Sequence, residues 1–431
     1  MRLHPARFLA LGAAAAITAS ALAGCGGAAT AQNGSNPDIL VGISLPLTGG
    51  FSADGQAFQK GYELWQSDVN SHGGLLGRQV KLKIVNDNSD PVKTKAQYKQ
   101  LIVGDHVNLT LGPFSSLLTT PAAEAVGPYH FAMIEGAGDA NGVFQDPLGD
   151  EKYHNVFSPS LPVSDYMRPL IDWIKSLPPS QRPKTAAYPS VDDPFSLPAV
   201  ATAQTKLQEA GIRTVYTSLP KGINEVTTTK DLNKAEATAY HGAAEATASS
   251  NAQIVILGST DVGTVATFMK VFEQRKYQPK LFIAVSGPDQ GQAFEGTVGK
   301  ANSNGVMVPG GWDGGYANAL SENMVEEYIA KYGGTAAGVN ADVAEAFSTG
   351  EVAADAVKAT HSISNVKIMQ YLHSGVTLQT VQGPAKFDKL GENHEAVAFA
   401  FQWQDGNFVQ VLGAQPNSAQ IQYPKAQWSN G

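Results

Sequence analysis

Few residue patterns in this sequence could carry covalent chemistry. The stretch "GAGDANG" (136–142) has two glycines of a dinucleotide-binding loop, but its third glycine comes one residue late and no confirming acid follows. The stretch "HEAVA" (394–398) lacks the second His of a zinc-binding helix. The nine histidines show no metal-ligand spacing, and neither G-x-S-x-G nor G-K-[ST] occurs. We therefore expect no cofactor, no metal site and no catalytic residue.

The chain contains one cysteine, Cys25, which lies directly behind an apolar run. A single cysteine forms no intrachain disulfide and no thiolate metal site by itself. Upstream, "MRLHPAR" carries two arginines and no acid, and residues 8–24 are apolar or small. That order is typical of a secretory signal peptide, whereas a membrane span would be longer and less rich in Ala. We expect residues 1–24 to be a signal peptide.

The four residues Leu22-Ala23-Gly24-Cys25 resemble the bacterial lipobox, in which the cysteine becomes the lipidated first residue of the mature protein. The alternative is an ordinary signal peptide with a chance cysteine. Residues 25–37 are small and polar without periodicity, which suits a flexible tether. The sequence therefore predicts a protein that works outside the cytoplasm, anchored to the bacterial cell membrane through Cys25.

Composition narrows the class of protein. The formal net charge is −8 and no block of basic residues occurs, so nucleic-acid binding is not expected. A chain of 431 residues is too long for one ordinary core, which indicates two domains. No second apolar stretch is long enough to span a bilayer.

Short apolar strands alternate with helices along the rest of the chain. Strands are expected at 38–47 and 79–88, with an amphipathic helix over 55–73 between them. A helix is expected to start at "TTPAAEAV", which would place Pro121 in its first turn. A second strand–helix series follows, and the chain closes with a β-hairpin whose turn is Asp405-Gly406. This order predicts an α/β fold with mostly parallel, doubly wound sheets in two lobes.

Two α/β lobes on one chain leave a crevice between them. Ligands of open α/β sheets bind beyond the carboxyl ends of the strands, and clefts between domains are common ligand sites. The residues that directly follow the strands are therefore the first candidates for a binding site.

The mature chain resembles the type I periplasmic binding proteins of branched-chain amino-acid ABC transporters. Three segments carry most of the resemblance: "LPLTG…G…G" (45–61), "VNSHGGLLGR" (69–78) and "GPFSS…TTPAA" (112–123). Weaker similarity lies at "DDPFS" (192–196), "SGPDQ" (286–290) and "GPAKFDKLGE" (383–392). The order and spacing of these segments are more specific than any one of them.

The resemblance implies two Rossmann-like lobes joined by three crossover segments, with the ligand in the cleft between the lobes. Lobe 1 would comprise residues 38–160 and 308–390. Lobe 2 would comprise residues 161–307, with 391–431 as its C-terminal part and tail.

The resemblance also implies site residues in lobe 1. A hydroxyl and backbone N–H groups after the third strand bind the ligand carboxylate in the family, and the matching positions are Ser115 and Ser116. The alternative for Ser116 is that it caps the following helix. A backbone carbonyl and a hydroxyl after the next strand receive the ligand ammonium, and these match Ala137 and Asp139. Asp139 replaces the usual Thr and could instead cap the next helix.

In lobe 2 the matching positions are Phe195, Thr260 and Asp289. The family often has tyrosines at the first two, while Asp289 keeps an acid that would pair with an ammonium. Asp54 stands where an aromatic wall residue is common. Trp312, which follows a crossover strand, could close the pocket or simply pack in a core.

These departures enrich the predicted pocket in acids. Glu135, Asp139, Asp289 and Asp54 exceed what a neutral amino acid requires, and buried unpaired carboxylates are costly. Either some of them face solvent, or the ligand carries more positive charge or more hydrogen-bond donors.

We therefore expect an extracytoplasmic solute-binding lipoprotein and not an enzyme. It would act as a monomer, capture an amino acid or a related amide or amine, and deliver it to an ABC permease. A ligand-sensing subunit for a membrane signalling partner and an exported hydrolase are the alternatives.

Overall fold

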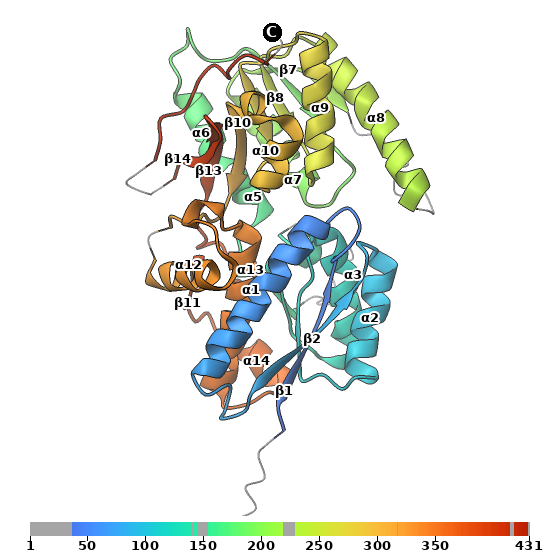
Figure 1. Ribbon diagram of the computed structural model, residues 1–431, viewed down its shortest axis with the longest axis vertical. Helices are drawn as coiled ribbons and strands as arrows, with labels where there is room; N and C mark the ends of the chain where they lie inside the picture. Colours follow the sequence, from blue (N-terminus) through green and yellow to red (C-terminus); the bar gives the residue numbers. More distant parts are fainter. Residues whose placement is uncertain are drawn as a thin grey trace, which may run out of the picture. The chain divides into compact units, whose positions relative to one another are not determined.

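The computed structural model describes residues 37–139, 141–144, 154–218, 229–316, 318–413 and 418–429. The described residues from Pro37 onward belong to one compact unit (Figure 1). The predicted signal peptide, Cys25 and all of the predicted tether except Pro37 lie outside the described residues.

The first lobe is built on a five-stranded parallel sheet of order β2-β1-β3-β4-β5. Its central strands are short apolar runs that are buried on both faces, as in other parallel sheets covered by helices. The strands are β1 (Ile39–Leu45), β2 (Val80–Asn86), β3 (Leu109–Leu111), β4 (Met133–Ile134) and β5 (Val156–Phe157). The connecting helices are α1 (Ser52–Ser71), α2 (Pro91–Val103), α3 (Ser116–Val126), the 3₁₀ turn η1 (Gly127–Tyr129) and α4 (Asn141–Phe144).

The second lobe is built on a seven-stranded sheet of order β14-β13-β10-β9-β8-β6-β7. Five of its strands are parallel: β6 (Thr185–Pro189), β7 (Arg213–Ser218), β8 (Ile254–Leu257), β9 (Leu281–Ala284) and β10 (Val306–Gly310). The helices around them are α5 (Val163–Tyr166), α6 (Arg168–Ser176), α7 (Ser196–Glu209), α8 (Thr229–Ser249), α9 (Val262–Gln274), α10 (Gln292–Val298) and α11 (Lys300–Ser303). Antiparallel strands β13 (Phe399–Gln404) and β14 (Asn407–Leu412) complete the sheet as the predicted hairpin around Asp405-Gly406.

Between β10 and β13 the chain returns to the first lobe, so it crosses between the sheets three times. Figure 1 shows α13 beside α1, although nearly 300 residues separate them in sequence. The returning elements are α12 (Ala319–Tyr332), the turn η3 (Ala336–Gly338), α13 (Ala341–Thr360), α14 (Asn365–Leu372) and the two-stranded ribbon of β11 (Leu378–Thr380) and β12 (Gly383–Ala385). These residues pack into the same hydrophobic core as β1 and α1.

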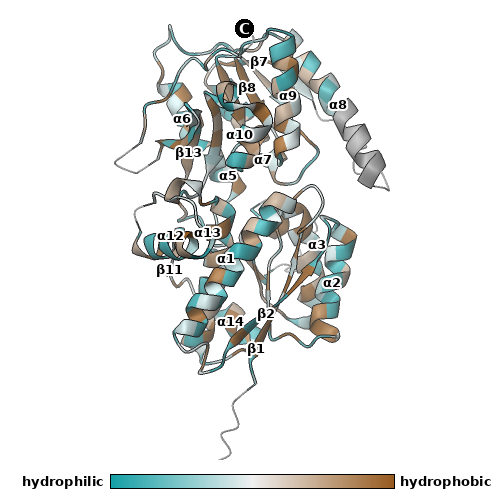
Figure 2. Ribbon diagram, in the orientation of Figure 1, coloured by the Kyte–Doolittle hydropathy of each residue, from teal (hydrophilic) through white to brown (hydrophobic). Residues whose placement is uncertain are grey.

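Alternating side chains of each central strand enter cores on opposite faces of the sheet. In β8, Ile254 and Ile256 pack with α6 and α7, whereas Val255 and Leu257 pack with α8 and α9. Figure 2 colours the strands mostly brown, while the surrounding helices alternate between brown and teal. Burial of both sheet faces is what a doubly wound α/β lobe requires, and the predicted α/β fold is confirmed.

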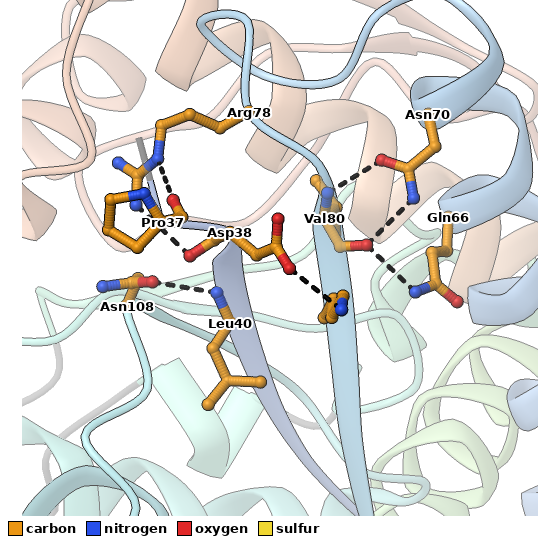
Figure 3. Close-up of polar contacts among 9 residues, drawn as sticks. Pro37, Asp38, Leu40, Gln66, Asn70, Arg78, Val80 and Asn108 are labelled. Atoms are coloured by element: carbon orange, nitrogen blue, oxygen red, sulfur yellow. Dashed lines mark hydrogen bonds and ion pairs between the residues drawn. The ribbon is translucent and has the colours of Figure 1, made fainter. Parts of the chain in front are cut away.

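The edge of the first sheet is closed by side chains (Figure 3). The amide of Asn70, at the end of α1, accepts from Val80 N at 2.7 Å and donates to Val80 O at 2.9 Å. Asn108 Oδ1 accepts from Leu40 N at 2.8 Å, and Arg78 donates to the carbonyl of Pro37. These contacts satisfy backbone groups at the ends of β1 and at edge strand β2, which would otherwise be open to further pairing.

Helix α3 begins earlier than expected. The prediction placed Pro121 in the first turn, but the helix starts at Ser116 and Pro121 lies inside it. The prediction was wrong because Ser116 and the two leucines before "TTPAA" extend the helix toward β3. No helix among the described residues is long and apolar enough to cross a membrane.

Candidate functional site

A cavity of about 840 Å³ is lined by residues from both lobes. This volume lies within the usual range for small-molecule sites. Seven of the nine predicted ligand-site residues line it: Ser115, Ala137, Asp139, Phe195, Thr260, Asp289 and Trp312. Ser116 and Asp54 do not line it; they lie directly behind lining residues. The fold therefore brings most of the residues predicted from the sequence to one cavity. Contact of each of them with a ligand stays a prediction.

The first-lobe wall starts where β3 leads into α3. Ser115 is the N-cap residue of α3, yet its side chain makes no cap hydrogen bond. Its hydroxyl is buried and has no partner among the described residues. Ser116 is the first residue of the helix rather than its N-cap residue, so the capping alternative for Ser116 is wrong. The Ser116 hydroxyl instead donates to the Ala137 carbonyl at 3.4 Å. The positive end of α3 and the Ser115 hydroxyl together suit an anionic group.

Glu135 shapes the loop after β4. Its carboxylate accepts from the N–H of Ala137 at 2.9 Å and from the N–H of Gly138. The side chain is fully buried and does not line the cavity. Burial raises the pKa of Glu135 to about 7, against the effect of the two backbone donors. Glu135 therefore braces the loop that presents Ala137 and Asp139.

Asp139 lies on the cavity wall and is 2% exposed. It accepts from the Tyr166 hydroxyl at 3.2 Å and from the Ser158 hydroxyl at 3.3 Å. Burial, and next the charge of Glu135, raise the pKa of Asp139 well above its usual value. Tyr166 also packs edge-on against Phe195, with ring centroids 5.2 Å apart. Tyr166 was missed by the sequence reasoning because α5 is only one turn long and carries no periodic signal.

In the second lobe the wall follows the ends of β8 and β9. Thr260 follows β8, and Asp289 follows β9. The Asp289 carboxylate accepts from Gly287 N at 2.7 Å and lies within 3.4 Å of the Ser286 hydroxyl. Burial raises the pKa of Asp289. Both residues stand beyond the carboxyl ends of parallel strands, where α/β sheets place their ligands.

The amide of Gln290 joins the two lobes. Its Nε2 donates to the carboxylates of Asp54 and Asp342, the latter at 3.3 Å, and its Oε1 accepts from Asn340 at 2.9 Å. Asp54 lies in the first turn of α1, and Asp342 lies in the first turn of α13. Asp54 is 3% exposed and stands behind Gln290, which itself lines the cavity.

Asp54 and Asp342 form a coupled carboxyl pair. Burial, and next the charges of Asp342 and Asp289, raise the pKa of Asp54 well above its usual value. Burial and the charge of Asp289 raise the pKa of Asp342 to about 7, while a hydrogen bond from Asp54 opposes that rise. Burial therefore favours the protonated form of both carboxyls, and a positive charge in the cavity would favour their ionisation.

Glu345 adds a further carboxyl to the wall. Burial raises the pKa of Glu345 well above its usual value, and the charges of Asp342 and Asp139 raise it further. Both Asp342 and Glu345 escaped sequence reasoning, which did not look beyond strand ends. The available signal was two acids three residues apart in the first two turns of α13.

Aromatic residues complete the wall. Trp312 is 2% exposed, and its Nε1 donates to the Ser321 hydroxyl at 3.0 Å. Trp312 therefore lines the cavity and also packs in the first-lobe core, so both predicted roles are compatible. Phe401 and Phe408 from the β13–β14 hairpin stack at 5.1 Å and face the same cavity.

Comparison with solved structures matches this fold to ligand-binding proteins. The branched-chain amino-acid transporter substrate-binding protein LivJ from Streptococcus pneumoniae, in complex with isoleucine, matches with a TM-score of 0.71 over 88% of this chain and 100% of that chain, at 14% identity. A solute-binding protein of an ABC transporter from R. palustris, in complex with benzoate, matches with a TM-score of 0.69 over 89% of this chain and 98% of that chain, at 16% identity. At these identities the likeness shows the shared fold.

Sequence relatives match over shorter stretches. The Leu/Ile/Val-binding protein homolog 2 of Brucella abortus is 32% identical over 109 residues, which is 25% of this chain and 29% of that protein. Homolog 1 of the same species is 37% identical over 87 residues, 20% of this chain and 23% of that protein. The matched stretches thus span less than a third of these curated relatives.

A family model described as periplasmic binding protein matches residues 38–412, which include both sheets and every residue of the cavity wall. The family is one of binding proteins and not of enzymes. The chain therefore belongs to the periplasmic binding protein family.

Proposed function

We propose that this protein captures a small amine-bearing solute, an amino acid or a related compound, outside the cytoplasm and delivers it to an ABC permease. The observation that carries the proposal is the composition of the cavity wall. The N-terminus of α3 with Ser115 supplies a site for a carboxylate, and Asp139 and Asp289 supply carboxylates for an ammonium. Such an arrangement matches the two charged groups of an amino acid.

Ligand binding would couple the two lobes. Asp139 belongs to the first lobe and Asp289 to the second. One ammonium can contact both carboxylates only when the two lobes are close together, so its binding would favour that arrangement of the lobes. A ligand shifts a conformational equilibrium only by its difference in affinity for the states. The lobe division proposed from the sequence, 38–160 with 308–390 and 161–307 with 391–431, is the division on which this coupling depends.

The membrane anchor is part of the proposal. Lipidation of Cys25 would hold the binding lobes near a permease in the same membrane, with residues 25–37 as the tether. A Cys25→Ala variant should move from the membrane fraction to the soluble fraction of the producing cells. Retention of the variant in the membrane would contradict the lipid anchor and leave the binding function untouched.

The binding function is tested by thermal denaturation of the purified full chain with a panel of amino acids, amides, amines and aromatic acids. A ligand that binds the native state raises the melting temperature by mass action. We expect a saturable rise with amine-bearing compounds and none with benzoate. A response confined to aromatic acids would contradict an amine-bearing ligand.

A further inference from the structure

Resting on the proposed function, we infer that the cavity carries a second cation subsite, formed by Asp342 and Glu345, and that the ligand is an amino acid with a positively charged side chain. The α-ammonium of such a ligand would lie with Asp139 and Asp289. Its side-chain cation would lie against α13.

The two carboxyls of this subsite share one face of α13. Asp342 and Glu345 are three residues apart, which places them on the same side of a helix, and both line the cavity. Like charges at this spacing destabilise a helix. Asp342 gains from the positive end of the helix dipole, but Glu345 lies a turn further along, where that effect has faded. A cation between the two carboxylates removes the repulsion.

Nothing else on the cavity wall supplies positive charge. The lining includes six acids, Asp139, Asp289, Glu295, Asp313, Asp342 and Glu345, and no lysine, arginine or histidine among the described residues. Within the described part of the chain, none of Asp139, Asp289, Asp342 and Glu345 is in an ion pair with a base. One α-ammonium can pair with only some of these acids. A buried carboxyl without a cation is either ionised at a cost in free energy or kept protonated by its raised pKa.

A separate observation indicates that the cavity is built to receive a ligand. Ser115, 5% exposed, lines the same cavity with a hydroxyl that has no partner among the described residues. A buried hydroxyl without a partner costs free energy unless a bound molecule pairs with it. The wall is therefore incomplete at the first-lobe end, where a ligand carboxylate would lie, as well as at the acidic end.

The positive group is organic rather than a metal ion. Among the described residues, the only acid or histidine group with ligand atoms close enough to share one ion is Asp388, Glu392 and His394, and none of these lines the cavity. Among the described residues the cavity acids therefore form no three-ligand metal cluster, whereas an organic cation requires no such convergence. Phe401 and Phe408 offer ring faces to the aliphatic stem or to the cation itself.

The test compares charged and neutral ligands of nearly equal shape by isothermal titration with the full chain. Arginine is paired with citrulline, and lysine with norleucine. We expect the charged member of at least one pair to bind at least tenfold more tightly, a difference of about 1.4 kcal/mol.

Two variants locate the effect. Asp342→Asn and Glu345→Gln should each reduce the ratio of the affinity for the charged ligand to that for its neutral partner by at least fivefold. The exposed Glu322→Gln on α12 is the control and should retain the full preference. Melting curves of each variant establish that it folds, and if one variant fails to fold the other still decides.

The outcomes distinguish failure of the second cation subsite from failure of the proposed solute-binding function. If amino acids bind but neither arginine nor lysine binds more tightly than its neutral partner, the second cation subsite is wrong and the amino-acid-binding function stands. If the preference exists but neither variant alters it, the subsite is wrongly located and the inference fails. If none of the four compounds and no other amine in the panel binds, the proposed function fails together with the inference.

Discussion

At the scale of single residues, the cavity wall is marked by buried carboxyls whose pKa values are raised by burial and by one another. Seven positions taken from the family resemblance line the cavity, because residues after parallel strands converge at one edge of a sheet. Asp342 and Glu345 could not be found in that way, since they come from a helix that returns to the first lobe from the far end of the sequence. Only the folded chain places them opposite Asp289.

Asp289→Asn tests the ammonium contact. The carboxylate is buried and already accepts from Gly287 N, so the neutral amide would lose the charge and present a donor toward the ligand. We expect the dissociation constant for an amine-bearing ligand to rise at least tenfold, about 1.4 kcal/mol. Isothermal titration measures this change, with Glu322→Gln as the surface control. An unchanged dissociation constant would remove Asp289 from the site.

The acids also predict how the ligand-free protein responds to pH. Burial raises the pKa of both Asp342 and Glu135 to about 7, above their unfolded values, so the folded chain binds more protons than the unfolded chain between about pH 4 and 7. The stability contributed by these groups is present at low pH and is lost as pH rises through 7. Since each pKa unit corresponds to about 1.4 kcal/mol, the melting temperature should be several degrees higher at pH 5.5 than at pH 8.

A matched variant identifies the source of that pH response. Asp342→Asn removes one of the titrating groups, while Asp289, Asp54 and Gln290, which face it, remain. The difference in melting temperature between pH 5.5 and pH 8 should shrink in this variant. A ligand-free protein that is more stable at pH 8 than at pH 5.5 would contradict the assignment.

At the scale of elements, alternation of apolar strands and helices was sufficient to predict the α/β fold and the terminal hairpin. The start of α3 was predicted less well, because Pro121 suggested a first turn and the helix in fact extends five residues before it. The packing of α1 against α13 could not be predicted from the sequence, since local periodicity does not show which distant helix a helix face will contact. The small residues on these helices were the only available indication that the two could approach closely.

Gly61→Ala tests that helix contact. A Cβ at Gly61 would lie 2.3 Å from the Val343 carbonyl oxygen on α13, so the helices would have to separate. We expect a loss of about 1–3 kcal/mol in unfolding free energy, as for other overpacked sites, measured by chemical denaturation. Gly242→Ala is the control, because Gly242 lies in α8 with nothing within 4 Å of the added Cβ and should be neutral or slightly stabilising. Equal stability of both variants would show that α1 and α13 do not pack closely.

At the scale of the whole molecule, three chain crossings give each lobe residues from distant parts of the sequence. The cavity wall therefore includes, from the first lobe, the loops after β3 and β4 and the start of α13. From the second lobe it includes the segments after β8 and β9 and the β13–β14 hairpin. A ligand bound there contacts groups that no single segment provides. The fold determines where the cavity lies, and the proposed preference for an amine-bearing ligand rests on the acids of the cavity wall.

In the proposed function, one amine-bearing ligand is held by both lobes at once. Hydrogen–deuterium exchange of the full chain should be measured with and without a saturating concentration of the amine-bearing compound that raises its melting temperature most. We expect slower exchange in the first lobe at residues 112–119 and 135–139 and, in the same experiment, in the second lobe at residues 286–290. Slower exchange in one lobe alone, or no change in either, would contradict it.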